Sequence, residues 1–349
     1  MVNPNSLFIK VTDLISALIY SLGFVKYCRL FSDLRLIFYH GIGNNDSPCL
    51  RYLNDEVPVE NFEYHLEYLL ENYTILSLSD ALDSITKKPI PTTSPVCSIS
   101  FDDGLSSVYD KAFPILKNKN IPATVFLNTS VIGNTGMTWL HLINYLLSEF
   151  GVNKISSLFN LYKSKYLTPA PADEISIQDW YKQYYEINHE KELLKKVLEH
   201  LNLSSAEIAE EQRIYLNWDE IYEMEEYDFT FCSHTQNHTP LARFADKYNL
   251  EKEIKGAYET LRQQGKNLDF ISFPFGMKED YGEKAIECAF NAGHKYIFEV
   301  GSGTNDLNRV KKFRLLARVC LGDVGKKRSL LFSAVELRPK LKTFIKGYI

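Results

Sequence analysis

The chain has 349 residues with 45% hydrophobic and 24% charged residues, an ordinary balance for a folded globular protein of one large domain or two smaller ones. Its net charge of −5 gives no sign of the clustered Lys and Arg that a nucleic-acid-binding surface needs. The six cysteines are scattered without a C-x-x-C pair, which argues against the disulfide framework of a small secreted protein.

The first 33 residues are predicted to form an N-terminal helical segment, followed by a catalytic domain over 34–345. The apolar run from Leu14 to Val25 is too short to span a bilayer, and it lacks the basic start and cleavage site of a signal peptide. We interpret it as an amphipathic helix packed on the domain, with peripheral membrane contact as the alternative. A cytoplasmic location is expected, with the inner face of the membrane as its variant.

Strand and helix patterns alternate along the rest of the chain. Strands are predicted at 34–40, 73–78, 96–101, 123–128, 228–233, 270–273, 296–300 and 313–321. Helices are predicted at 58–72, 79–85 with Ser79 as N-cap, 218–226, 249–265 and 280–293. Residues 136–212 contain only helical patterns and are predicted to be an insertion. This β-α order is typical of a mostly parallel sheet or barrel.

Two adjacent carboxylates, Asp102 and Asp103, stand at the end of the strand at 96–101 and are followed by Gly104. Neighbouring anions repel each other, so such a pair is expected where a metal binds one of them or where a proton is shared. In β/α folds the carboxyl ends of the strands share the face that carries the active site. The pair is therefore a candidate catalytic centre.

His234 and His238 form a second signal at the end of the strand at 228–233. Two histidines four residues apart can aim both rings at one ion, either on a helical turn or in a tight loop. Alone, the pattern would favour two surface histidines, but together with Asp102 and Asp103 it favours a metal site. A His-His-Asp set leaves coordination positions open for water and substrate, which suits a hydrolytic ion better than a structural one.

These residues carry a family resemblance. Ser100–Gly104 resembles the first motif of the polysaccharide deacetylases, the NodB-homology or carbohydrate esterase family 4 group. His234–His238 resembles their second motif, and Ser272–Gly276 resembles their third. The order of the motifs also matches. The resemblance implies an α/β fold, a distorted (β/α)7 barrel of the NodB-homology type, here with the helical insertion at 136–212.

The resemblance also implies roles for residues. Asp103, His234 and His238 would bind a divalent metal, for which zinc fits best and cobalt, nickel or manganese are alternatives. Asp102 would be the general base. The substrate would be bound by Pro274, Phe275, Gly276 and Trp139.

The sequence departs from the family pattern at two places. The family's third motif has an arginine that orients the base, where this chain has Ser272, so that role is either lost or filled elsewhere, with Arg318 as a candidate. The family's final Leu-x-x-His motif, whose histidine protonates the leaving amine, is missing. His40 ends the first predicted strand, as in circularly permuted members that resemble poly-N-acetylglucosamine deacetylases. We expect His40 to be the general acid, against the alternative of a histidine that only caps a loop.

The residues and the resemblance together predict a metal-dependent carbohydrate N-deacetylase acting on an N-acetylated saccharide or a lipid-linked saccharide precursor, and the resemblance implies an envelope pathway. An amidase or deformylase of the same fold acting on another substrate is the alternative enzyme. A non-catalytic saccharide-binding protein is the alternative from a different class. Against it stand the buried carboxylates, which are costly to keep without a use.

Overall fold

The structure is a computed structural model, and it describes residues 4–24, 34–53, 55–87, 94–162, 187–244, 247–301, 305–307, 309–322 and 324–341. Within these residues, seven parallel strands close into a barrel, because the strand at 35–39 pairs on one side with the strand at 315–320 and on the other with the strand at 96–101. The barrel strands are β1 (Arg35–Tyr39), β5 (Val96–Phe101), β6 (Ala123–Leu127), β7 (Phe229–Ser233), β8 (Phe270–Ser272), β9 (Tyr296–Val300) and β10 (Leu315–Cys320). The predicted (β/α)7 barrel is confirmed.

Three short strands lie outside the closed ring. β4 (Thr74–Ile75) adds to the outer side of β5, and β2 (Gly41–Ile42) pairs with β3 (Glu56–Val57) in a small sheet directly after β1. Only β4 was predicted. Strands of two residues, such as β2 and β3, are too short to give an alternating pattern in the sequence.

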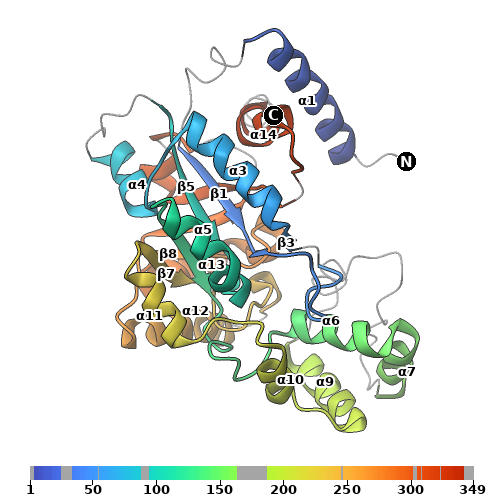
Figure 1. Ribbon diagram of the computed structural model, residues 1–349. Helices are drawn as coiled ribbons and strands as arrows, with labels where there is room; N and C mark the ends of the chain where they lie inside the picture. The colour runs from blue at the N-terminus through green and yellow to red at the C-terminus, as the bar shows by residue number, and fades with distance from the viewer. Residues whose placement is uncertain are drawn as a thin grey trace.

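Helices follow most barrel strands and cover the outside of the barrel (Figure 1). They are α3 (Val59–Asn72), α4 (Leu78–Thr86), α5 (Phe113–Asn118), α11 (Trp218–Glu225), α12 (Lys247–Gln263) and α13 (Lys278–Ala292). A π-helical turn, Val108–Ala112, leads into α5. The predicted N-cap of α4 was wrong. The Ser77 side chain accepts a hydrogen bond from the backbone N–H of Asp80, so Ser77 caps the helix instead of Ser79.

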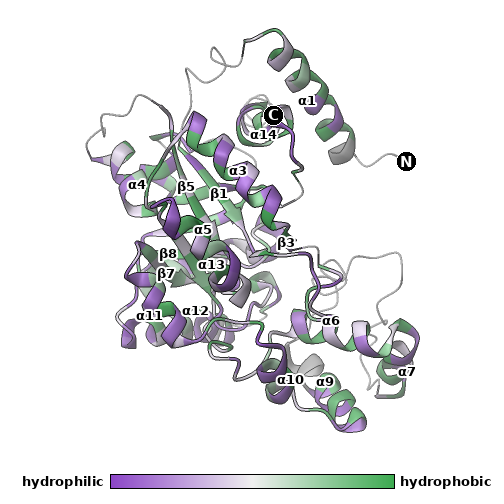
Figure 2. Cartoon of the chain, in the orientation of Figure 1, coloured by the Kyte–Doolittle hydropathy of each residue, from purple (hydrophilic) through white to green (hydrophobic). Residues whose placement is uncertain are grey.

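Alternate strand residues face opposite sides of the barrel wall, as the pleat of a strand requires. Ile37 and Phe101 pack outward, in one cluster with the apolar faces of α3 and α5. Phe126 and Phe298 lie in a second cluster, in which Leu82 of α4 takes part. The strands are accordingly hydrophobic, whereas the surrounding helices mix hydrophobic and hydrophilic residues (Figure 2). The wall is thus stabilised by burial on both faces.

The predicted insertion is helical where the structure describes it. It contains α6 (Trp139–Phe150), α7 (Val152–Tyr162), α9 (Ile187–Leu201) and α10 (Ser205–Gln212), with residues 163–186 outside the described part. These helices gather at one side of the barrel and have their own apolar cluster, which includes Leu146, Phe159 and Val197 (Figure 1).

The N-terminal helix α1 (Pro4–Ser21) packs against the C-terminal helix α14 (Arg328–Phe332) and the π-helical turn Ser333–Leu337 that follows it. Asp13 pairs with Arg338 at 2.7 Å, and the Tyr20 ring meets Phe332 edge-on at 6.1 Å. The predicted helix is therefore present and begins earlier than its apolar run. None of the helices in the described part of the chain combines the length and the apolarity needed to cross a membrane.

Candidate active site

A left-handed turn presents the two carboxylates at the end of β5. Asp103 has φ 69° and Gly104 has φ 68°, a region that aspartate tolerates and glycine enters freely. A Cβ on Gly104 would lie 2.8 Å from Cδ2 of Leu127, so any other residue would have to displace that side chain as well as adopt the left-handed backbone. The backbone N–H of Asp102 donates to the carbonyl of Tyr39 at 2.9 Å, which ties the turn to β1. The Asp-Asp-Gly motif thus forms a turn at the end of the strand in which both acids are buried.

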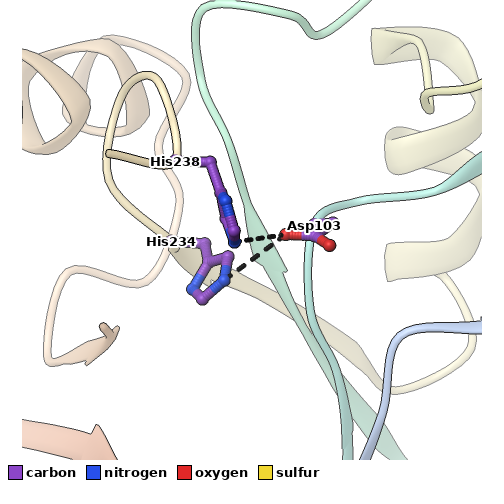
Figure 3. A group of neighbouring side chains, drawn as sticks. All are labelled: Asp103, His234 and His238. Carbon is purple, nitrogen blue, oxygen red and sulfur yellow. Dashed lines mark ion pairs between the residues drawn. The ribbon is translucent and has the colours of Figure 1, made fainter. Parts of the chain in front are cut away.

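Asp103, His234 and His238 converge on one point (Figure 3). Oδ1 of Asp103 lies 3.4 Å from Nε2 of His234 and 3.3 Å from Nε2 of His238. Two ligands of a tetrahedral zinc ion, each about 2.0–2.1 Å from the metal, stand roughly 3.3 Å apart. The spacing therefore matches that of ligand atoms around a single ion. Asp103 Oδ1 is also buried without a hydrogen-bond partner, as expected of an oxygen kept for a cation.

The protonation of the two histidines suits a metal as well. Nδ1 of His234 bonds the carbonyl of Ser272 at 2.9 Å, so this nitrogen carries the proton and Nε2 keeps its lone pair. Burial lowers the pKa of His234 to about 4 and also lowers the pKa of His238. Burial raises the pKa of Asp103 to about 7. A divalent cation would bind the neutral imidazoles through their lone pairs and would stabilise the ionised form of the acid.

The histidine pair lies in a loop after β7, not on a helix. Thr235 and His238 both have positive φ, 68° and 57°. Two backbone hydrogen bonds fix the loop against the end of β6, from Thr129 N–H to the Thr235 carbonyl at 3.2 Å and from Ser130 N–H to the Gln236 carbonyl at 3.0 Å. Two left-handed residues, held by a neighbouring loop, therefore bring both rings to Asp103.

Asp102 has a different environment from Asp103. Arg318 of β10 binds it with both ends of its guanidinium, at 2.7 Å from Nη1 to Oδ1 and 2.6 Å from Nη2 to Oδ2. The guanidinium lies over the rings of Phe38 and Phe126, at 4.4 and 5.2 Å from their centroids. Burial opposes ionisation of Asp102, but Arg318 and His234 lower the pKa of its carboxyl overall. Asp102 is thus held as a carboxylate.

Arg318 takes the role of the arginine that the third motif lacks at Ser272, which is to orient the base. Its Nη2 donates to the Ser272 hydroxyl at 2.6 Å, and that hydroxyl lies 3.5 Å from Oδ2 of Asp102. A serine at position 272 therefore leaves room for an arginine that comes from another strand. The contact shows that Arg318 orients Asp102 in this chain.

His40 stands beside the carboxylates because β1 closes the barrel next to β5. Tyr39 is in register with Phe101, so the residues that follow, His40 and Asp102, are neighbours at the strand ends. Nδ1 of His40 lies 3.7 Å from Oδ1 of Asp55. Burial alone would lower the pKa of His40, but Asp55 and then Asp103 and Asp102 raise it above its ordinary value. His40 can therefore carry a proton at the edge of the site.

The predicted substrate-binding residues have different surroundings. The Phe275 ring meets His238 edge-on at 4.9 Å, so the Pro274-Phe275-Gly276 turn borders the metal-binding group. Gly276 has φ 71°, and a Cβ there would lie 2.4 Å from the backbone nitrogen of Val300, so the turn depends on glycine. Trp139 begins α6 and is partly buried against the apolar cluster of the insertion. Its contact with a sugar stays a prediction.

Sequence reasoning missed three residues near this site. Asp55 precedes β3 in a loop without periodicity, and no local signal could have identified it. His141 and Tyr215 belong to the insertion and to the segment that leaves it, and they contact each other at 2.6 Å. Of the insertion, only Trp139 was predicted to contact substrate, so the structure is what brings these two side chains to attention.

Comparisons with known proteins agree with this geometry. The family model described as Polysaccharide deacetylase matches residues 90–297, and the chain belongs to this family. It is 32% identical over 126 residues to YxkH of Bacillus subtilis (strain 168), whose name assigns it to polysaccharide deacetylases. It is 35% identical over 92 residues to the poly-beta-1,6-N-acetyl-D-glucosamine N-deacetylase of Staphylococcus epidermidis. These matches cover 36% and 26% of this chain, and 41% and 31% of those relatives.

Two solved structures have a similar fold at low sequence identity. The Streptococcus pyogenes deacetylase PplD in complex with acetate gives a TM-score of 0.55 at 17% identity, covering 87% of this chain and 98% of that one. IcaB from Ammonifex degensii gives 0.52 at 15% identity, covering 87% and 97%. These likenesses support the barrel fold.

Proposed function

We propose that the protein is a metal-dependent carbohydrate N-deacetylase that removes the acetyl group from an N-acetylated amino sugar. The observation that carries this proposal is that the two adjacent acids have different surroundings. Asp103 faces two neutral histidines, whereas Asp102 is held ionised by Arg318. Family membership and a relative named for N-deacetylation of a poly-N-acetylglucosamine support the class of substrate.

The chain's own residues account for the proton movements. Hydrolysis of the acetamide needs a base that takes a proton from the attacking water and an acid that gives one to the leaving nitrogen. Asp102 is the base, and Arg318 fixes its orientation. His40, whose pKa is raised by Asp55, Asp103 and Asp102 against the effect of burial, is the acid. One water is consumed, and acetate and a free amino sugar are released.

A divalent ion bound by Asp103, His234 and His238 would supply Lewis-acid stabilisation of the negative charge that develops on the acyl oxygen. Zinc suits two imidazoles and one carboxylate, and cobalt, nickel and manganese are alternatives. Phe275, packed against His238, would border the bound acetamide on one side.

The test is acetate release from N-acetylated saccharides, beginning with β-1,6-linked N-acetylglucosamine oligomers and including a lipid-linked N-acetylated sugar. We expect the metal-loaded protein to release acetate and expose free amines, and a chelator to abolish release until Zn²⁺, Co²⁺, Ni²⁺ or Mn²⁺ is returned. His40→Ala should lower kcat by about 10²–10⁴, the contribution of one general acid. His200→Ala, an exposed histidine on α9, is the matched control and should leave kcat unchanged.

Other results would assign another function. Formate release in place of acetate would identify a deformylase, and release only from non-sugar amides would identify an amidase. Saccharide binding without release of any acid from the metal-loaded protein would favour a binding protein that kept the fold. Full activity after complete chelation would remove the metal from the proposal.

We also infer that α1 rests on an anionic membrane surface. Leu7, Leu14 and Leu18 are 56%, 74% and 60% exposed, in a stripe along one helix face. The buried side of the helix carries Thr12 and Ser16 beside Tyr20, and the Ser16 hydroxyl donates to the Ser329 carbonyl. A helix packed on a soluble domain normally buries its apolar face. An apolar face left uncovered on a peripheral helix, here α1 beside α14 (Figure 1), is typical of a helix lying in a membrane interface.

The charges on α1 favour anionic lipid over a second copy of the chain as the partner of its exposed apolar face. Lys10 is exposed, and Asp13, the helix's one acidic residue, is paired with Arg338. The outward face is therefore apolar with positive charge, which suits anionic lipid headgroups. Two copies meeting through this face would bring their Lys10 side chains into the same interface.

Sedimentation with lipid vesicles tests the membrane contact. We expect binding to vesicles that contain anionic phosphatidylglycerol, and Leu14→Ser with Leu18→Ser should weaken it at least tenfold, because two apolar side chains are lost from the contact. Leu161→Ser, which replaces a 65% exposed leucine at the end of α7, is the control and should bind as the wild type does. Equal binding by the double variant and the wild type would contradict the membrane contact. A wild-type dimer in solution that becomes a monomer in the double variant would assign the face to a second copy.

A further inference from the structure

His141 is a buried histidine of the insertion with one nitrogen occupied and one unused. It is the third residue of α6, and only 2% of it is exposed. Its Nδ1 lies 2.6 Å from the Tyr215 hydroxyl and 3.1 Å from the Thr138 hydroxyl. Its Nε2 is buried and has no hydrogen-bond partner. Buried polar atoms are normally satisfied, so an unused one requires an explanation.

The contacts of Tyr215 show which nitrogen of His141 carries the proton. The Tyr215 hydroxyl accepts the backbone N–H of Thr138 at 3.0 Å, which leaves its own proton to be donated. The nearer acceptor is Nδ1 of His141 at 2.6 Å, compared with Oγ1 of Thr138 at 3.3 Å. Burial lowers the pKa of His141 to about 3, so the ring is neutral and has a single N–H. With Nδ1 accepting, that N–H is on Nε2.

The ring lies near both the metal-binding group and the candidate acid. His40 acts electrostatically on His141, and His141 acts in the same way on His238. Tyr215, which holds the ring, faces Leu105 in an antiparallel bridge directly after the Asp102-Asp103-Gly104 turn, and the next residue, Leu216, donates its N–H to the Gly104 carbonyl at 2.9 Å. The residues near His141 therefore include those that would surround the scissile acetamide.

We infer that His141 is a substrate-binding residue, whose Nε2–H donates a hydrogen bond to an oxygen of the N-acetylated sugar residue held between the metal-binding group and His40. The inference rests on the proposed deacetylase function and deepens it. A fixed N–H in a site from which water is largely excluded gains its partner when substrate enters. The insertion thereby contributes to sugar recognition through α6, and Tyr215 positions the donor without touching substrate.

Steady-state kinetics on the best substrate of the acetate-release panel test the inference. We expect His141→Ala to raise KM about tenfold with a smaller change in kcat, because a ground-state contact is lost. His141→Gln, which offers an N–H at a similar reach, should recover most of the affinity. Tyr215→Phe should raise KM less than His141→Ala does, and the double variant should be no worse than His141→Ala alone, since both changes act through the same ring.

His294 provides the matched control. It is also a buried histidine with an unused Nε2, but it precedes β9 at the opposite end of the barrel and is held by the Leu268 carbonyl. His294→Ala should leave KM unchanged, even if it lowers the melting temperature. Wild-type KM in His141→Ala, or equal damage in the Ala and Gln variants, would overturn the inference while leaving the deacetylase function intact. Absence of activity in the wild type would instead overturn the proposed function.

Discussion

Replacing Asp102 with asparagine is expected to lower kcat by about 10²–10⁴, because the amide cannot take the proton that the carboxylate would accept from water. The substitution keeps the side-chain volume, and an asparagine oxygen can still accept from Arg318. KM should change less than kcat, since Asp102 acts on the attacking water rather than on the sugar. Metal content, measured on the purified variant, should stay at the wild-type level, because Asp103, His234 and His238 are untouched.

Ser272→Ala is the matched control for this experiment. It removes the hydroxyl that accepts Nη2 of Arg318 but leaves both hydrogen bonds between Arg318 and Asp102. Its activity should stay within about tenfold of the wild type, the cost of one neutral hydrogen-bond partner. If Asp102→Asn kept the activity of this control, Asp102 would not be the base.

Replacing Arg318 with methionine should have the largest effect on stability. Arg318 and Asp102 are 1% and 3% exposed at their side chains, so removing the cation leaves a buried carboxylate without compensation. The expected loss is about 3–5 kcal/mol in the free energy of unfolding, measured by denaturant titration. Activity should fall with it, because the carboxylate loses the two hydrogen bonds that fix its orientation. Arg318→Lys should recover stability only in part, since an ammonium cannot bind both oxygens as a planar fork.

A surface pair of similar geometry provides the comparison. Arg328 binds both carboxylate oxygens of Glu71, but their side chains are 32% and 56% exposed. Arg328→Met should cost no more than about 1 kcal/mol, because solvent screens the pair. The double variant Asp102→Asn with Arg318→Met should be less destabilised than the sum of the single variants, because it leaves no buried charge unpaired. Equal effects of Arg318→Met and Arg328→Met would contradict the assigned role of burial.

Local patterns in the sequence were sufficient for most of the barrel. The apolar runs that became β5 and β7 are bounded by abrupt polar ends, and the amphipathic repeat of α3 begins after Pro58. Where elements are short, the patterns failed, as for β2 and β3. Period-based reasoning needs several residues on one face, and a strand of two residues has none to repeat.

The sequence by itself identified the candidate site residues, because Asp102, Asp103, His234 and His238 sit at strand ends in a recognisable order. The sequence also named His40 and Arg318 as candidates, but only the tertiary structure showed how they join the site. The closure of the barrel by β1 brings His40 beside Asp102, and β10 delivers Arg318 from 216 positions away in the chain. The physical reason is that such contacts arise from the register between strands distant in the sequence, which a local pattern does not specify.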